Sequence, residues 1–304
     1  MCTDVEKVWW TGVKTVLPQN LGKVLWPGVF TKGDLLEYLA TVGTVMIPHL
    51  KDRPVTVIRY PDGIEEEGFF QKHPPPGTPD WVTRVTIGEG EAIVIDRLET
   101  LLWLGQLGAI EYHVTFSRFP AVDRPTYLVF DLDPSVEGFA AVCRVALMIR
   151  DVLTRLGLPS YPKTSGATGI QVYVPIHGSV TFEQTRPLMR TIAKYCEHRA
   201  PELITTERRV RARGNRVYID YLQHAPNKTL IAPYSPRAVP TAAVSAPLQW
   251  EEVERGMAPE NWTIATMAKR LQKMGDLFAP VLDPGVDIRP LLQHLDELSS
   301  KRSP

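Results

Sequence analysis

Cysteine is scarce in this sequence, with only Cys2, Cys143 and Cys196 among 304 residues. So few cysteines, so far apart, support neither a disulfide framework nor a zinc site, and they suit a reducing compartment. Long apolar runs are also lacking: none approaches the ~20 residues that a membrane-spanning helix needs. The N-terminus, MCTDVEKVWW, has no apolar core typical of a signal peptide. These absences predict a cytoplasmic protein with no membrane partner.

Net charge is absent as well, because 34 basic residues balance 34 acidic ones. This balance excludes a uniformly basic nucleic-acid-binding surface but leaves room for a local basic groove. Apolar residues make up 44% of the chain and charged residues 22%, which is ordinary globular usage. No repeat and no low-complexity tract is visible. The length fits two domains or one large α/β domain.

Apolar periodicity and proline-rich loops divide the chain into expected elements. Helices are expected at 31–46, 98–108, 136–158, 181–199, 249–255, 261–273 and 287–299. Strands are expected at 54–60, 91–96, 109–116, 126–133, 160–164, 169–176, 216–221 and 229–233. This order predicts an α/β or α+β fold, with a mixed sheet in the region 110–233 and an α/β module before it. The short linkers predict subdomains that share a cleft.

Three of these strands carry polar side chains on one face, because side chains alternate along a strand. Asp131 and Asp133 lie on one face of TYLVFDLD, Asp220 lies on the polar face of RVYIDY, and Gln171 lies on that of GIQVYVPI. Neighbouring carboxylates repel each other unless a cation lies between them, and Mg²⁺ and Mn²⁺ take oxygen ligands. Three such acids predict a site for two ions about 3.5–4 Å apart, the arrangement of polymerases.

The acidic pair alone does not distinguish a metal site from two simpler possibilities. Asp-x-Asp also occurs in nucleotide-sugar transferases and at plain solvated strand ends, and by itself the pair favours neither a metal site nor a solvated one. The predicted common face with Asp220 is what favours the metal site. A nucleotide-sugar transferase would leave Asp220 without a role, and no glycine-rich Rossmann turn follows an early strand.

Loops beside these strands carry groups that suit phosphate. In YPKTSGATG, the small residues Ser165, Gly166 and Gly169 let backbone N–H groups approach an anion, and Lys163 adds positive charge. The segment lacks the order of a Walker A loop, and a flexible hairpin loop accounts for it equally simply. Arginines crowd the segment before the strand of Asp220, where they favour a phosphate-binding rim over ordinary solvated surface: Arg208, Arg209, Arg211, Arg213 and Arg216. Arg237 is a further candidate, or an exposed loop arginine.

Two aromatic residues stand among charged ones in EEEGFFQKH. If this segment is a strand, alternation turns either Phe69 or Phe70 away from the core, where it could stack on a base near Arg59 and Lys72. An edge-strand packing pair is an equally good interpretation. His113 lies on an expected strand, and a lone strand histidine is more often structural than catalytic.

Several long motifs, in the same order along the chain, resemble the polymerase domain of bacterial end-joining DNA ligases, of the archaeo-eukaryotic primase superfamily. The motifs that carry the resemblance are FDLDP (130–134), YPKTSGATGIQVYVP (161–175), VYIDY (217–221) and TLIAPYSPRAVPTAAVSAPLQWEEV (229–253), with N-terminal stretches at 20–39, 58–81 and 101–113. The resemblance implies a single primase-polymerase domain over 1–304, here as a stand-alone protein. Its expected parts are an N-terminal α/β module (1–108), an RRM-like catalytic module (109–245) and C-terminal helices (246–304).

The resemblance also implies roles for individual residues. Asp131, Asp133 and Asp220 match the metal ligands. His113, Lys163, Ser165 and Arg237 match positions that hold the incoming nucleotide, mainly through its triphosphate. Phe69 and Phe70 match the aromatic pair that meets the template, Lys23 and Lys32 match the basic pair that grips a downstream 5′-phosphate, and Arg213 matches a loop arginine near the active site. Arg59, from its place near the aromatic pair, and Arg213 are also expected to contact DNA.

Two motifs depart from the family. Gln171 stands where the family has histidine in G-L-H-V; it can hydrogen-bond a phosphate but cannot carry charge. The family's D-Y-N-Q-N is Asp220-Tyr221-Leu222-Gln223-His224 here, which removes the basis for assigning sugar or template contacts to that loop.

The leading hypothesis is a template-directed nucleotidyltransferase acting at gaps or broken DNA ends with a 5′-phosphate. The resemblance implies two Mn²⁺ or Mg²⁺ ions, NTP or dNTP substrates with a preference for ribonucleotides, a nucleoid-associated location, and Ku and a separate ligase as partners. Two alternatives stay open: a primase that makes primers de novo, and a largely non-catalytic module that bridges DNA ends, motivated by Gln171.

Overall fold

A computed structural model describes residues 18–135 and 138–300 of the chain. The N-terminal ten residues and the expected helix start at 136 lie outside this range. The chain forms two compact units, each described here by itself. Unit 1 comprises residues 1–114, 230–246 and 260–276, and unit 2 comprises 115–229, 247–259 and 277–304. In the described part of the chain no helix is long and apolar enough to cross a membrane.

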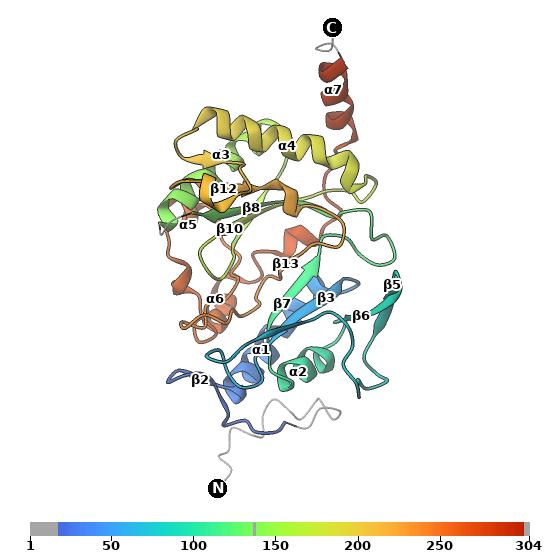
Figure 1. The fold of residues 1–304 in the computed structure, drawn as a ribbon, viewed down its shortest axis with the longest axis vertical. Coiled ribbons are helices and arrows are strands. Elements are labelled where there is room, and N and C mark those ends of the chain that lie inside the picture. Colours follow the sequence, from blue (N-terminus) through green and yellow to red (C-terminus); the bar gives the residue numbers. More distant parts are fainter. Residues whose placement is uncertain (1–17, 136–137, 301–304) are drawn as a thin grey trace. The chain divides into compact units, whose positions relative to one another are not determined.

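Unit 1 is a mostly antiparallel sheet with helices packed on it (Figure 1). The strand order is β13-β7-β3-β6-β5, and β4 pairs with β3. Its elements are β1 (Val24–Trp26), β2 (Phe30–Thr31), α1 (Lys32–Leu50), β3 (Pro54–Arg59), β4 (Phe69–Gln71), β5 (Arg84–Ile87), β6 (Gly90–Val94), α2 (Leu98–Gln106), β7 (Ala109–Thr115), β13 (Thr229–Ile231, at the unit boundary) and α6 (Met267–Met274). Helix α1 begins where Thr31 and Asp34 form a capping box, and it buries Leu35, Leu39 and Val42 completely.

Unit 2 is a second sheet, of order β11-β12-β8-β10-β9, which α3 and α4 cover (Figure 1). Its elements are β8 (Tyr127–Pro134), α3 (Phe139–Arg155), β9 (Tyr161–Thr164), β10 (Ile170–Pro175), α4 (Phe182–Arg199), β11 (Ile204–Thr205), β12 (Val217–Asp220), α5 (Trp250–Glu254) and α7 (Arg289–Ser300), with 3₁₀ turns at Val210–Ala212, Tyr221–Gln223 and Ala279–Leu282. Among these described strands, only β11 and β12 pair in parallel. The mixed α+β fold predicted from the sequence is confirmed.

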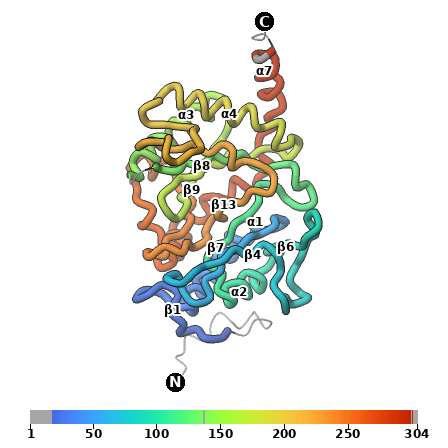
Figure 2. The backbone as a smooth tube through the Cα atoms, viewed as in Figure 1, coloured from blue at the N-terminus to red at the C-terminus, as the bar shows by residue number. Residues whose placement is uncertain are grey.

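The division into units differs from the predicted subdomain boundaries at 108 and 245. Residues 230–246 and 260–276 return to unit 1, where Ala232 N–H donates to the carbonyl of Tyr112 at 2.8 Å (orange segments in Figure 2). The predicted C-terminal helices are therefore split, with α6 in unit 1 and α5 and α7 in unit 2.

One predicted helix is wrong in its first turns. The helix expected from 261 begins only at Met267, because the preceding residues pair with a hairpin instead. Val244 N–H donates to the carbonyl of Trp262 at 2.8 Å, and Thr263 forms an antiparallel bridge with Ala243. An extended backbone at 262–263 cannot be helical at the same time. Strands β1, β2, β5 and β11 were not expected, since they are short and carry little alternation.

Cysteines behave as predicted where the structure describes them. Cys143 and Cys196 are free, buried side chains on α3 and α4. Burial raises the pKa of each thiol to about 11, so both stay protonated and unreactive at neutral pH.

His224, the last residue of the departing D-Y-N-Q-N motif, is a core residue of unit 2. It is 3% exposed, and its ring lies 4.9 Å from that of Phe182 and 5.7 Å from that of Phe116. Its Nε2 lies 3.1 Å from Oγ1 of Thr185. Burial lowers the pKa of His224 to about 3, so the folded protein keeps the imidazole neutral.

We predict that His224 makes the protein acid-sensitive. Between its ordinary pKa of about 6.5 and its folded value of about 3, only the unfolded state protonates the ring, so stability falls as the pH falls through that window. Acidification from pH 6.5 to 5 should cost about 2 kcal/mol through this group alone. Thermal unfolding measured across this range should show a flatter pH dependence for His224→Gln.

The matched control is His198→Gln, a change at an exposed position on α4. It should keep the slope of the unaltered chain. Equal slopes for His224→Gln and the unaltered chain would contradict the assignment.

Candidate active site

A single row of polar residues crosses four strands of unit 2. Antiparallel register places Asp220 on β12 opposite Asp131 on β8, Asp131 opposite Gln171 on β10, and Gln171 opposite Lys163 on β9. Directly opposed residues in an antiparallel pair point to the same face, with Cβ atoms about 4.5–5.5 Å apart. The structure therefore brings two of the predicted acids, the predicted lysine and Gln171 onto one sheet face.

The third acid, Asp133, lies two residues along β8 and so shares this face. Its register partner is Tyr218 on β12. The turn after β9 approaches closely here: a Cβ on Gly169 would lie 2.6 Å from the carbonyl oxygen of Leu132 and 3.4 Å from Oδ1 of Asp133. Only glycine fits this position, which accounts for the glycine that precedes β10.

The three carboxylates affect one another electrostatically. Burial, together with the charges of Asp133 and Asp220, raises the pKa of Asp131 to about 7, against the opposing effects of Gln171 and Lys163. Asp131 is only 9% exposed. A cation would remove this repulsion, since all three groups offer the oxygen ligands that hard cations take.

As they stand, these side chains are not arranged as a finished metal site. Within residues 18–135 and 138–300, no three His, Cys, Asp or Glu side chains are grouped closely enough to hold an ion. Oδ1 of Asp131 accepts a hydrogen bond from Gln171, and Oδ1 of Asp220 accepts one from the backbone N–H of Gln223 at 3.0 Å. The donor chemistry nevertheless fits a divalent cation, because all three groups are carboxylates.

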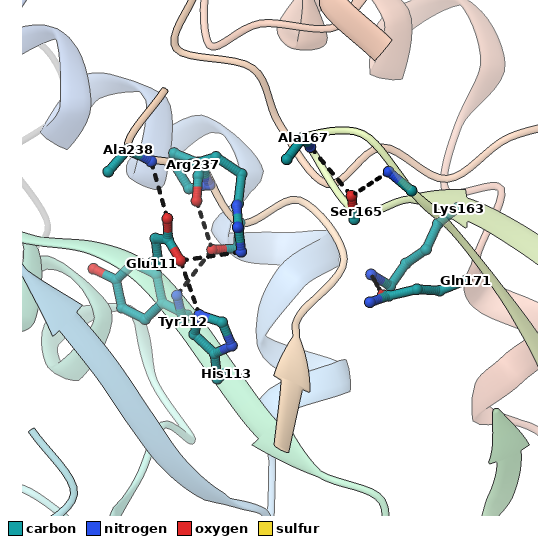
Figure 3. Close-up of polar contacts among 12 residues, drawn as sticks. Glu111, Tyr112, His113, Lys163, Ser165, Ala167, Gln171, Arg237 and Ala238 are labelled. Carbon is teal, nitrogen blue, oxygen red and sulfur yellow. Dashed lines mark hydrogen bonds and ion pairs between the residues drawn. The ribbon is translucent and has the colours of Figure 1, made fainter. Parts of the chain in front are cut away.

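Gln171 connects the acids to the lysine. Its Nε2 donates to Oδ1 of Asp131 at 3.0 Å, and its Oε1 accepts from Nζ of Lys163 at 2.5 Å. Gln171 is 2% exposed and Lys163 is fully buried; the pair is visible in Figure 3. Both ends of the amide are engaged within unit 2, so here Gln171 is a bridge between opposite charges, where the sequence had suggested a phosphate ligand.

Ser165 organises the turn between β9 and β10. Its Oγ accepts hydrogen bonds from the backbone N–H groups of Ala167 at 3.2 Å and Gly169 at 3.0 Å (Figure 3). Because these two bonds use the oxygen as an acceptor, the hydroxyl proton is available to donate. The turn is thus held by its own hydrogen bonds, and the Ser165 hydroxyl is available as a donor where the turn begins.

The other predicted nucleotide contacts form a separate cluster in unit 1, around Glu111 on β7. Oε2 of Glu111 lies 3.0 Å from Nε2 of His113 and 3.1 Å from Nη1 of Arg237, and its Oε1 accepts from the backbone N–H of Ala238 at 3.1 Å (Figure 3). Burial opposes ionisation of Glu111, yet the hydrogen bond from His113 and the charge of Arg237 leave its pKa below its ordinary value. Glu111 is therefore an ionised, buried anchor for the side chains of His113 and Arg237.

Glu111 was missed by the sequence reasoning. It is 4% exposed, and a buried glutamate is rare unless it is paired. The available signal was its position two residues before His113 on a strand, which puts both side chains on one face. The partner of this pair, Arg237, lies more than 100 residues further along and gives no local signal.

Arg237 keeps one donor unused. Its Nε is buried and has no hydrogen-bond partner among the residues that the structure describes, whereas its Nη1 faces Glu111. A buried, unsatisfied donor on a guanidinium is costly unless a ligand accepts from it. This geometry suits an anionic ligand at Arg237.

A second basic site lies in unit 1, in a pocket of about 440 Å³. Lys23, Lys32 and Arg59 all line it, together with Trp81 and Trp103. Burial and then the nearby charge of Lys23 lower the pKa of Lys32, so the pocket holds like charges close together. Lys23 pairs with the exposed Asp62 at 2.6 Å. The structure thus gathers the residues predicted to grip a 5′-phosphate.

The aromatic pair lies beside this pocket on β4. Phe69 is 45% exposed and Phe70 68% exposed, so both rings face solvent, where alternation had predicted only one. The guanidinium of Arg59 lies 5.1 Å from the ring centroid of Phe69, and it donates to Gln71 and to the carbonyl of Leu107. Arg59 is thereby fixed between the pocket and the aromatic pair.

The arginine-rich segment divides into braced and exposed residues. Arg213 stacks on Tyr218 at 3.7 Å and donates to the carbonyls of Glu207 and Arg208; Arg216 donates to those of Ala212 and Arg213. These two arginines hold the segment against β12. The exposed arginines are 208, 209 and 211.

Comparison with known proteins agrees with these features. Residues 31–278 match the family described as LigD, primase-polymerase domain. The chain is 43% identical over 247 residues to the bifunctional non-homologous end joining protein LigD of Bacillus subtilis, covering 81% of this chain and 40% of the relative. It is 36% identical over 273 residues to the multifunctional non-homologous end joining protein LigD of Mycolicibacterium smegmatis, covering 86% and 35%.

Similarity extends to a solved structure. The polymerase domain of Mycobacterium tuberculosis Ligase D, in complex with DNA, superposes with a TM-score of 0.84 at 33% identity, covering 89% of this chain and 99% of that one. The chain therefore spans about two fifths or less of the curated relatives' length but nearly all of the solved polymerase domain. Match, identity and fold together show that this chain belongs to the LigD primase-polymerase domain family.

Proposed function

We propose that the protein is a template-directed nucleotidyltransferase that adds nucleotides at gaps or broken DNA ends during end-joining repair. The observation that carries the proposal is the pairing of Asp131 with Asp220 across two strands, with Asp133 on the same face, in a chain of this family. Three acids on one sheet face are unfavourable without a cation and useful with one.

Two divalent ions, Mn²⁺ or Mg²⁺, would be held by Asp131, Asp133 and Asp220. When bound, such ions supply charge neutralisation on the attacking and leaving oxygens of an in-line displacement. The chain's own part is to hold the three carboxylates in place. Gln171 holds Asp131 by one oxygen, and the backbone of Gln223 holds Asp220 in the same way.

Nucleotide binding is assigned to His113, Arg237, Ser165 and Lys163. Arg237 offers its unpaired Nε to a phosphate, while Glu111 fixes the rest of the guanidinium. Ser165 offers its hydroxyl proton. Lys163 acts indirectly, because its Nζ donates a hydrogen bond to Oε1 of Gln171. Gln171 in turn donates to Asp131 and so links the lysine to the acids.

DNA binding is assigned to the pocket of Lys23, Lys32 and Arg59 and to the exposed Phe69 and Phe70. A 5′-phosphate in the pocket would offset the burial and the charge of Lys23, which together lower the pKa of Lys32. Exposed rings stack on bases without sequence preference. The exposed arginines of 207–216 would add salt-dependent backbone contacts.

Further aspects of the proposal come from the family resemblance. They are a preference for ribonucleotides, best activity with Mn²⁺, and cooperation with a Ku-type end-binding protein and a separate ligase. The solved relative is in complex with DNA, which supports DNA as the partner of this chain.

We predict that Asp131→Ala abolishes nucleotide addition. Removing one of the three carboxylates should lower the rate of nucleotide addition by about 10²-fold or more. This is the effect expected when one electrostatic stabiliser of a transition state is removed. The measurement is primer extension on a gapped duplex with a 5′-phosphate, in the presence of Mn²⁺.

The control for this experiment is Asp283→Ala, which removes an exposed aspartate of unit 2 outside the row. It should extend primers like the unaltered chain. Equal extension by Asp131→Ala would refute the metal assignment.

The unaltered chain also decides between the alternative functions. Tight DNA binding without pyrophosphate release would favour the DNA-bridging alternative. Product formation without a primer would favour a primase.

We also predict that Lys32→Gln removes recognition of the 5′-phosphate. The unaltered chain should bind a gap with a 5′-phosphate more tightly than one with a 5′-hydroxyl. In the variant the ratio of these two affinities should be about tenfold smaller, which is about 1.4 kcal/mol in binding free energy. Fluorescence anisotropy with the two duplexes measures it.

Lys51→Gln is the matched control, because Lys51 is exposed at the end of α1 and does not line the pocket. It should keep the preference for the phosphorylated gap. A preference unchanged by Lys32→Gln would show that the phosphate binds elsewhere.

A further inference from the structure

The loop that presents Arg237 is a narrow, buried hairpin in unit 1. Tyr234 N–H donates to the carbonyl of Ser245 at 2.8 Å, Ser245 N–H to that of Ser235 at 2.9 Å, and Arg237 N–H to that of Ala243 at 2.9 Å. Arg237 is therefore the last paired residue before the hairpin tip. Its position depends on how the chain enters the hairpin.

The entry point is a strained residue. Tyr234 has φ of +67°, in the left-handed region that bulky side chains rarely adopt. Such a conformation is energetically unfavourable and persists only where the surroundings enforce it. Here it makes the sharp bend between β13 and the residues that reach Glu111.

Hydrogen bonds hold Tyr234 at its backbone and at its hydroxyl. The hydroxyl of Tyr38, on α1, donates to the carbonyl of Tyr234 at 2.6 Å. The Tyr234 hydroxyl donates to Oδ1 of Asp276, whose Oδ2 lies 3.4 Å from Nε2 of His49. Tyr234 is 2% exposed, and its hydroxyl stays protonated because burial and Asp276 raise its pKa.

The bend has a direct consequence for the site. One residue later, Oγ of Ser235 accepts from the backbone N–H of Tyr112 on β7 at 2.9 Å. Two residues after that, Arg237 meets Glu111, the neighbour of Tyr112 on the same strand. A change of backbone conformation at Tyr234 would move Arg237 off Glu111.

We propose that Tyr234 and Asp276 are positioning residues, whose hydrogen bond enforces the bend that sets Arg237 for phosphate binding. This inference rests on the role given to Arg237 in the proposed function. Neither side chain contacts the nucleotide. They act by fixing the backbone three residues before the arginine.

The test is a set of variants of the full chain, assayed for gap filling with ATP and for binding of inorganic triphosphate by calorimetry. Tyr234→Phe should raise KM for ATP and Kd for triphosphate roughly tenfold, with kcat changed less than about twofold, because the metal-binding row in unit 2 is untouched. Asp276→Leu should behave alike. Asp276→Asn keeps an oxygen that accepts from the tyrosine, so it should bind triphosphate nearly normally.

A double-mutant cycle separates positioning from general destabilisation. If Tyr234 acts through Arg237, Tyr234→Phe should have no further effect on Kd in the Arg237→Ala background. Additive losses would mean a merely structural role and would overturn the inference. Tyr127→Phe is the control: it removes another hydroxyl bonded to a backbone carbonyl, that of Thr115 at 3.2 Å, and should leave Kd unchanged.

The outcomes also distinguish this inference from the proposed function. If Arg237→Ala leaves triphosphate binding unchanged, the role of the arginine is wrong and the inference falls with it. If Arg237→Ala weakens binding and Tyr234→Phe does not, only the inference fails. The calorimetric readout needs no turnover, so it decides the question even for an inactive enzyme.

Discussion

Strand register in unit 2 is the constraint on which the candidate active site depends. The pairing of β12, β8, β10 and β9 sets Asp220, Asp131, Gln171 and Lys163 in one row across the sheet. A slip of one residue in any pair would turn one of these side chains to the opposite face, among the apolar residues covered by α3 and α4. Leu128, Phe130 and Leu132, all fully buried on β8, fix the register by their burial.

Charge is balanced differently at the two groups of functional residues. In unit 2, carboxylates crowd together and Gln171 is interposed between them and Lys163, so negative charge is left to attract cations. In unit 1, Glu111 orients His113 and Arg237 without using all their donors, and the pocket of Lys23, Lys32 and Arg59 keeps an excess of positive charge. The carboxylates of unit 2 thus suit metal ions, and the two basic groups of unit 1 suit phosphates, although the chain as a whole has zero net charge.

The structure shows which contacts are made by Gln171 and His224, two residues that depart from the family motifs. Gln171 replaces a residue able to carry charge with one that accepts from Lys163 and donates to Asp131 simultaneously, since an amide carries both an acceptor and a donor. His224, at the end of the altered D-Y-N-Q-N motif, fills the space between Phe116 and Phe182 as a neutral ring. The first change concerns the site itself, and the second concerns the packing of the core.

Sequence alone determined the elements whose signals are local: the period-2 strands with Asp131, Asp133 and Asp220, the capped helix after Thr31, and the family motifs. Tertiary structure decided what depends on distant residues. Glu111 becomes an anchor only when Arg237 returns to β7, and residues 262–266 are not helical because residues 242–244 pair with this segment. The physical reason is range. Side-chain alternation and capping act within a few residues, whereas strand register and polar contacts join distant segments, as far apart as the 227 residues between His49 and Asp276.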